Sequence, residues 1–157
     1  MSHEARFQAL ELELPPAPKP VGLYKPIVVV GDLAYLSGHG PLKPDGSLMV
    51  GCVGQDVDQQ AAYQAARQTG LAILATLRNA FGSLDRVQRV VKVLGLVNAV
   101  AGFDQQPAVI NGCSELFSQV FGPEEGVGAR SAVGAASLPC GMTVEVEAIF
   151  ELVHDRD

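Results

Sequence analysis

The sequence predicts an α+β domain in which two helices pack on one face of a mixed β-sheet. Three features of the 157-residue chain lead to this prediction. A run near the C-terminus alternates apolar and polar residues, which is typical of a half-buried strand. Two longer segments carry apolar residues three and four positions apart, as amphipathic helices do. Between them lies a β-branched run that is apolar on both faces, as a central strand is.

Residues 1–20 are expected to form an N-terminal proline-rich arm, followed by one domain at 21–157. Proline lacks a backbone N–H and clashes with the preceding helical turn, so the stretch ELELPPAPKP cannot be one long helix. We expect a short helical or irregular start. An extended arm follows, which packs along a surface or across a subunit interface.

A β-hairpin is expected where the arm ends. Two β-prone runs at 27–30 and 33–37 flank Gly31-Asp32, and glycine supplies the positive φ that a two-residue turn needs. After the turn KPDGS, a further short strand is expected at 48–53.

A long helix is predicted at 56–81. Asp56 is expected to be its N-cap, with Gln59 three residues later as in a capping box, and Gly82 is placed to end it. Its buried face is expected to comprise Ala62, Ala66, Thr69, Ile73, Leu77 and Phe81.

A second helix is predicted at 103–121. Pro107 fits its first turn and Gly122-Pro123 ends it. Its buried face is expected to comprise Val109, Cys113, Leu116, Phe117 and Val120.

Three strands complete the predicted sheet: a central one at 87–97, one at 131–138 and the alternating one at 143–153. In the last strand every second residue from Val144 to Leu152 faces one way, and Glu145, Glu147 and Glu151 face the other. The element order is therefore ββ(β)αβαββ.

Composition argues against a nucleic-acid-binding protein and against a disulfide-rich or metal-binding one. The chain has 11 Lys and Arg against 17 Asp and Glu, a net charge of −6, and shows no basic cluster, so nucleic-acid binding is not expected. Cys52, Cys113 and Cys140 are far apart and are expected to be free thiols, with neither a disulfide framework nor a metal site. No signal peptide or membrane span is evident, and a cytoplasmic location is expected.

Arg130 is the first candidate binding residue, because it stands alone in the stretch GARSAVGAASLP with no acidic residue within three positions. Its planar guanidinium matches a carboxylate or a phosphate, and its small neighbours leave room for a ligand. The alternative is a structural ion pair with Glu145 or Glu147.

Glu145 and Glu147 are two residues apart and so share one face of a strand. Two such carboxylates can do acid–base work, because their repulsion raises the proton affinity of one of them. The alternative is a solvated outer face. His39 lies between glycines in SGHGP, where a ligand can approach the backbone, although a lone loop histidine is more often a surface group.

The stretch GARSAVGAASLPCGMTVEVEAIF resembles the C-terminal signature of the RidA/YjgF family, which shows P-A-R-S/T, a small-residue strand, L-P and then V-E-I/V-E-A-I. VGLY at 21–24 is similar to the family's I-G-P-Y, and YLSGHGPL at 35–42 to its strand ending S-G-Q-x-P. The resemblance extends over residues 21–153. Relatives of this kind carry labels such as endoribonuclease L-PSP and chorismate-mutase-like.

The resemblance implies a chorismate-mutase-like sandwich, a homotrimer and ligand clefts between subunits. It also implies hydrolysis of reactive 2-imino or enamine acids, such as 2-aminoacrylate, to 2-keto acids and ammonia, without metal or organic cofactor. Arg130 would bind the substrate carboxylate and Glu145 would hold or activate water. The other implied binding residues are Tyr24, Gly38, Asn111 and Ala132, with Gly38 and Ala132 acting through their backbones.

Three departures from the family pattern bear on function. Ala132 stands where the family has a cysteine, His39 where it has a glutamine, and Gly128 where it has a proline. We expect the missing cysteine thiol to change the pocket's chemistry and the histidine to change its charge. The glycine is expected to make the loop before Arg130 looser.

Alternatives to an imine deaminase are a trimeric protein that binds a small carboxylic acid without turnover, an endoribonuclease and a chorismate mutase. The charge balance disfavours the endoribonuclease. A chorismate mutase needs further cations for a dicarboxylate, and Lys25 and Arg67 have no motif support.

Overall fold

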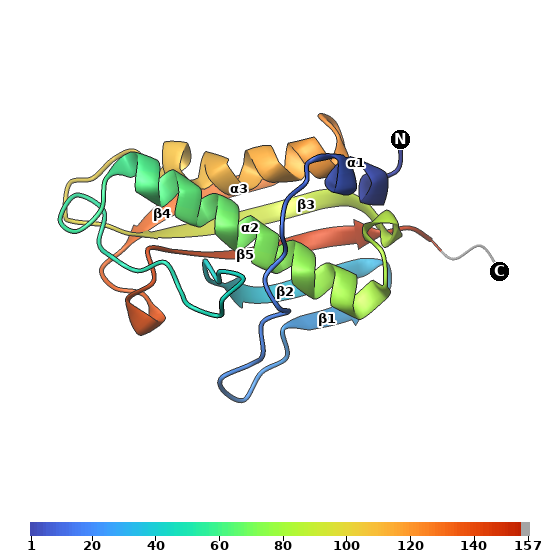
Figure 1. Cartoon of the computed structure of the whole chain (residues 1–157), viewed down its shortest axis with the longest axis horizontal. Helices are drawn as coiled ribbons and strands as arrows, with labels where there is room; N and C mark the ends of the chain where they lie inside the picture. Colours follow the sequence, from blue (N-terminus) through green and yellow to red (C-terminus); the bar gives the residue numbers. More distant parts are fainter. Residues whose placement is uncertain (155–157) are drawn as a thin grey trace.

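The computed structural model describes residues 1–154 and has the predicted α+β architecture, with one mixed sheet and two long helices on one of its faces (Figure 1). The strands follow the spatial order β1-β2-β5-β3-β4. β3 and β4 are parallel and the other neighbours are antiparallel. The elements are α1 His3–Ala9, β1 Ile27–Val30, β2 Leu33–His39, α2 Gln59–Phe81, β3 Val87–Asn98, α3 Gln106–Phe121, β4 Ala129–Ala135 and β5 Val144–Leu152, with single 3₁₀ turns at Leu84–Arg86 and Pro139–Gly141.

The start of α2 differs from the prediction, because Asp58 and not Asp56 is its N-cap. The Asp58 carboxylate accepts a hydrogen bond from the N–H of Ala61 at 2.8 Å. Asp56 instead accepts from the N–H of Cys52 at 2.8 Å and closes the turn before the helix. Two aspartates two positions apart are equally good caps by sequence, and the folded turn decides between them. Gly82 ends the helix at a φ of 79°, as predicted.

The predicted strand at 48–53 is wrong. The segment forms only isolated bridges, such as Leu42 to Leu48 and Val50 to Met142, because it crosses the end of the sheet without running beside a strand. The hairpin at Gly31-Asp32 is confirmed, with Val30 paired to Leu33.

The core lies between the sheet and the two helices. The predicted inner face of β5 is buried from Val144 to Leu152, and α3 buries the five residues expected of it. Phe117 of α3 and Phe150 of β5 pack edge to face, with ring centroids 5.5 Å apart. The opposite face of the sheet carries neither long helix (Figure 1).

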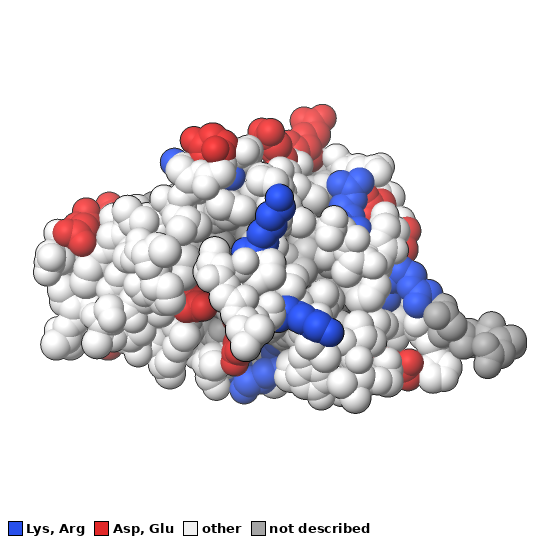
Figure 2. Space-filling view, turned by 90° about the horizontal axis from the view of Figure 1, so that it is seen from below, with Lys and Arg blue, Asp and Glu red and all other residues white. Residues whose placement is uncertain are grey.

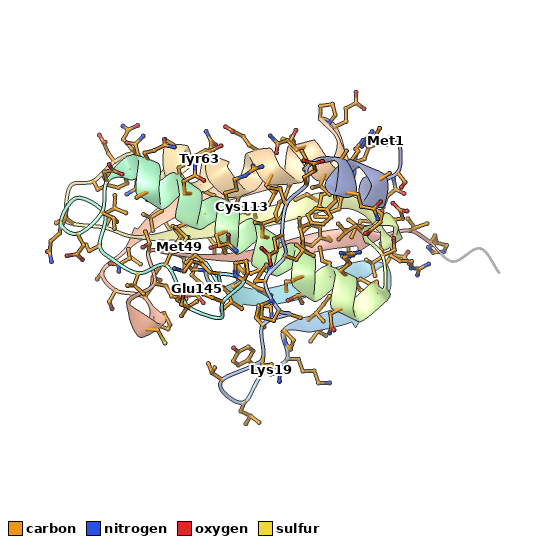
Figure 3. All side chains as sticks on the ribbon, in the orientation of Figure 1. Met1, Lys19, Met49, Tyr63, Cys113 and Glu145 are labelled. Atoms are coloured by element: carbon orange, nitrogen blue, oxygen red, sulfur yellow. The ribbon has the colours of Figure 1, made fainter. Side chains whose placement is uncertain are left out.

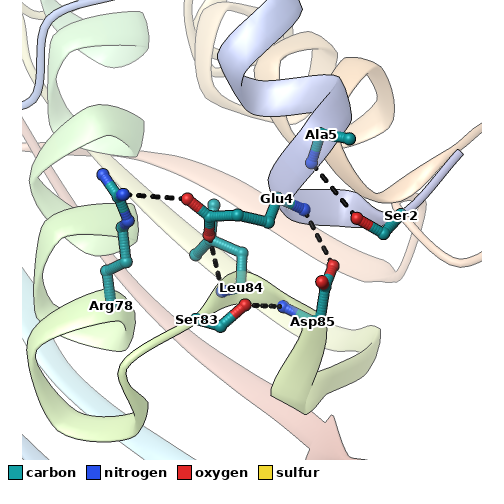
Figure 4. Close-up of polar contacts among 7 residues, drawn as sticks. All are labelled: Ser2, Glu4, Ala5, Arg78, Ser83, Leu84 and Asp85. Atoms are coloured by element: carbon teal, nitrogen blue, oxygen red, sulfur yellow. Dashed lines mark hydrogen bonds and ion pairs between the residues drawn. The ribbon is translucent and has the colours of Figure 1, made fainter.

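The N-terminal segment is fastened to the rest of the chain at α1. Glu4 ion-pairs with Arg78 of α2 at 2.9 Å and accepts a hydrogen bond from the N–H of Leu84 at 3.0 Å, while the N–H of Glu4 donates to Asp85 at 2.8 Å (Figure 4). Phe7 is buried in the core. The arm that follows crosses the outside of α2 and reaches the lower edge of the sheet (Figure 1).

No helix in the described chain is long and apolar enough to cross a membrane.

Candidate functional site

Glu145 lies on β5 and points away from the helices, beside the backbone of Gly38 on β2. A Cβ atom built on Gly38 would lie 2.1 Å from the Glu145 carboxylate oxygen, so only glycine permits this approach. Partial burial raises the pKa of Glu145 above its ordinary value, and the charge of Glu147 adds to the effect. A carboxyl with a raised pKa holds a proton more readily than an ordinary glutamate, which favours a role as a general acid–base.

A cavity of about 530 Å³ opens beside this carboxylate. Tyr24, Gly38 and Glu145, three of the residues predicted for the site, all line it. In Figure 3 Glu145 lies near the middle of the molecule and Lys19 lies on the projecting loop of the arm below it. The arm therefore borders the cavity, in addition to any role at a subunit interface.

A β-bulge presents Ser37 and Gly38 to the cavity. The ladder between β2 and β5 shifts register between Leu36 and His39 and skips the two residues between them. Ser37 is held in this bulge by its hydroxyl, which donates to the carbonyl of Lys25 at 2.6 Å.

His39 fixes the same bulge from inside the protein. Its Nδ1 lies 2.6 Å from the carbonyl oxygen of Ser37, which can only accept, so Nδ1 carries the proton. Nε2 then accepts from the hydroxyl of Thr76 at 2.8 Å. Burial lowers the pKa of His39 and keeps the ring neutral. The expectation that this histidine changes the charge of the pocket is therefore wrong, because its ring is buried and both nitrogens are occupied.

Gly38→Ala should remove any reaction that depends on the Glu145 carboxylate while leaving the fold intact. The added methyl would occupy the position of the Glu145 carboxylate, and that flexible side chain would move instead of the backbone. Turnover and thermal unfolding should be measured side by side. Gly22→Ala is a suitable control, since its Cβ would meet only Tyr24 ring atoms at 3.7 Å. Unchanged turnover in Gly38→Ala would contradict the role given to the Glu145 carboxylate.

Arg130 forms a second cluster with two residues of α3. Its Nη1 donates to Asn111 at 2.7 Å and to Ser114 at 3.1 Å. In the described chain no carboxylate contacts the guanidinium, so the ion pair with Glu145 or Glu147 considered from the sequence is not formed. Two neutral partners fix one edge of the guanidinium and leave its charge uncompensated for a ligand.

The register of the sheet explains why the ion pair is absent. Arg130 is paired with Val93, and Val93 with the buried Ala148, so Arg130 emerges on the side of the helices. Glu145 is paired with Leu96 on the opposite side. Ala132, two residues after Arg130, shares the side of Arg130. One chain therefore brings Tyr24, Gly38 and Glu145 together but does not join them to Arg130, Asn111 and Ala132.

Sequence reasoning missed several residues of these clusters. Ser114 is one of them, although its spacing of three from Asn111 on a predicted helix places both on one face. The apolar lining of the cavity from the arm and from the loop before α2 was also missed, because both segments are irregular and carry no periodic signal.

The three cysteines are free, as predicted. Burial raises the pKa of Cys113, which lies near Arg130, to about 12, so this thiol remains protonated at neutral pH. Among residues 1–154 no three His, Cys, Asp or Glu side chains come together as metal ligands.

Charged side chains are scattered over the face of the molecule seen in Figure 2, and Lys and Arg form no continuous patch there. Arg67, considered from the sequence as a second cation, donates to Gln119 at 2.9 Å and is not among the residues that line the cavity. Neither cluster thus offers the array of cations that RNA or a dicarboxylate would require.

Comparison with known proteins places these clusters in context. A family model described as "YjgF/chorismate_mutase-like, putative endoribonuclease" matches residues 4–151. The chain is 40% identical to Protein TCP17 of Trypanosoma cruzi, over 94% of this chain and 92% of the relative. It is 31% identical to a protein of Dermatophagoides farinae named 2-iminobutanoate/2-iminopropanoate deaminase, over 88% and 92%. Among solved structures, Atu1372 of Agrobacterium tumefaciens, described as having unknown function, superposes with a TM-score of 0.86 at 40% identity, over 96% of this chain and 94% of the other.

Proposed function

Since the chain belongs to the YjgF/chorismate-mutase-like family, we propose that it is an enamine/imine deaminase that hydrolyses 2-imino acids to 2-keto acids and ammonia. The observation that carries this proposal is that the chain offers both an acid–base group and a cation that is free to bind a carboxylate. Glu145 has a raised pKa beside a cavity, and Arg130 has no carboxylate partner in the described chain. A relative at 31% identity is named for this activity.

The proposed reaction needs few protein groups, because the carbon of an imine is already electrophilic. Arg130 binds the carboxylate of the 2-imino acid through two parallel hydrogen bonds. Water attacks the imine carbon while the Glu145 carboxylate accepts one of its protons, and the C=N bond becomes a C–N single bond. The protonated Glu145 then returns the proton to the nitrogen, which gives a carbinolamine. The Glu145 carboxylate next accepts the hydroxyl proton of the carbinolamine and passes it to the amino group, the C–N bond breaks, the ketone forms and ammonia leaves.

We further propose that Arg130 and Glu145 of one cleft come from different subunits of a homotrimer. Two observations support this arrangement. The two side chains lie on opposite sides of the sheet in a single chain. The face of the sheet without helices also exposes apolar side chains, with Val28, Tyr35 and Val133 each more than 40% accessible. Large exposed apolar side chains on one face are typical of a surface that a partner covers.

The test is release of 2-oxobutanoate from freshly generated 2-iminobutanoate, with and without the protein. We expect clear acceleration over the spontaneous hydrolysis. Absence of acceleration by a folded trimer would refute the deaminase and leave the alternative from the same clusters, a protein that binds a small carboxylate without turnover.

A further inference from the structure

The walls of the cavity beside Glu145 are mostly apolar. Two irregular segments supply them. One is residues 18–26, which comprise the end of the arm and its continuation as far as β1, and the other is the loop at 40–48. The turn that leads into β5 completes the walls. The apolar lining residues are Pro18, Pro20, Val21, Pro26, Leu42, Leu48, Pro139 and Met142. Walls of this kind bind hydrocarbon and offer few partners to a polar group.

The cavity has little means of binding a charged side chain. Besides Glu145, its only fully charged lining residue is Lys19, which is exposed on the projecting loop of the arm (Figure 3). The ring of His39 is neutral and its nitrogens are bonded to Ser37 and Thr76. Among the lining residues of this chain an acidic substituent could pair only with the exposed Lys19 and a basic one only with Glu145, whereas most of the lining is apolar.

The part of the cleft that this chain contributes is already larger than the smallest imino acids fill. A volume of about 530 Å³ lies within the range of sites for larger small molecules, roughly 300–1,000 Å³. A substrate with a single methyl group would leave most of the apolar surface in contact with water. A longer hydrocarbon chain would cover it and gain the free energy of that burial.

The segment that precedes the cavity-lining residues of the arm is anchored to the core. Leu10, Leu12 and Leu14 pack against the core, and the ion pair of Glu4 with Arg78 fastens the segment before them. The four prolines between residues 15 and 20 restrict the backbone further. Anchoring at one end and the four prolines both reduce the entropy that the wall would lose when a ligand binds.

We infer that this cavity receives the substrate's side chain and selects 2-imino acids that carry an extended, uncharged aliphatic chain. The inference rests on the proposed function, because it assumes that the carboxylate is bound by Arg130 and that the reacting carbon lies at Glu145. It adds the class of substrate, for which the walls formed by Val21, Leu42, Leu48 and Met142 are responsible.

Binding of the stable 2-oxo acid products tests the inference without turnover. Calorimetry should compare pyruvate, 2-oxobutanoate, 2-oxopentanoate and 2-oxohexanoate at fixed pH and salt. A buried methylene contributes about 0.8 kcal/mol, so each added methylene is expected to lower Kd about fourfold. A series in which Kd stays constant, or in which none of the acids binds, overturns the inference.

Matched variants test whether the gradient, that is, the fall of Kd with increasing chain length of the 2-oxo acid, arises in the cavity. Val21→Asp should abolish the dependence of Kd on chain length, because a charged group replaces part of the apolar wall. Leu23→Asp is its control, because Leu23 is equally exposed on the same arm but does not line the cavity. Since both side chains are almost fully exposed, neither change threatens folding. Leu48→Asp against Val50→Asp repeats the comparison at the loop before α2, where Leu48 lines the cavity and Val50 does not. An unaltered gradient in Val21→Asp and Leu48→Asp would contradict the assignment.

The two proposals fail in different ways. Hydrolysis of 2-iminopropanoate without a gradient in Kd would refute the aliphatic pocket and leave the deaminase standing. A gradient in Kd without hydrolysis of any imino acid would refute the deaminase and support the pocket as a site for aliphatic 2-oxo acids.

Discussion

Arg130→Ala is expected to lower kcat/KM for 2-iminobutanoate by at least about a hundredfold and to remove measurable binding of 2-oxobutanoate. A hydrogen bond to a charged group contributes about 1.5–3 kcal/mol, and a bidentate guanidinium supplies two. The fold should persist, because the guanidinium is half-buried and its partners Asn111 and Ser114 are neutral. Calorimetry with 2-oxobutanoate and steady-state kinetics measure both effects.

Arg67→Ala is the matched control, because this arginine also donates to a neutral side chain, Gln119, but has no place in the proposed site. It should bind 2-oxobutanoate as the wild type does. Thermal unfolding and sedimentation should accompany the measurements. If Arg130→Ala unfolds or dissociates, the residue is structural and its assignment to the substrate carboxylate fails.

Glu145→Gln is expected to lower kcat by roughly 10²–10⁴, the usual contribution of a positioned acid–base group, with little change in the Kd of 2-oxobutanoate. Glutamine keeps the shape of the side chain and cannot accept the proton of water. Equal losses of turnover and binding would mean that Glu145 positions the ligand and does not transfer a proton.

The pH profile gives a second readout of the same residue. Glu145 must be deprotonated to act as a base, so kcat/KM of the wild type should fall as the pH drops through its pKa. Burial and Glu147 raise that pKa, so the fall should begin at a higher pH than an exposed glutamate would give. Glu147→Gln, two residues along the same strand, should keep kcat within a few-fold and move the fall to lower pH.

Co-expression of the two inactive variants tests the shared cleft. If Arg130 and Glu145 of one cleft belong to different subunits, each mixed trimer contains one cleft with both residues intact, and activity returns. If both residues acted within one subunit, mixed trimers of these two variants would stay inactive.

Most of the secondary structure could be predicted from the sequence, because its signals are local. The alternation along β5, the proline in the first turn of α3 and the glycine that ends α2 each act within a few residues. The N-cap of α2 and the strand expected at 48–53 were wrong for the opposite reason. Both depend on where the segment after Cys52 lies against the rest of the fold.

The sequence by itself determined that Arg130 has no acidic neighbour along the chain and that Glu145 and Glu147 share one face of a strand. These facts follow from residue order and from the two-residue period of a strand. The tertiary structure decided that Arg130 and Glu145 lie on opposite sides of the sheet, and that a bulge held by His39 presents Gly38 to Glu145. It also decided that the proline-rich arm lines the cavity. Register, burial and the path of an irregular segment arise from contacts between residues far apart in sequence, and no local pattern encodes them.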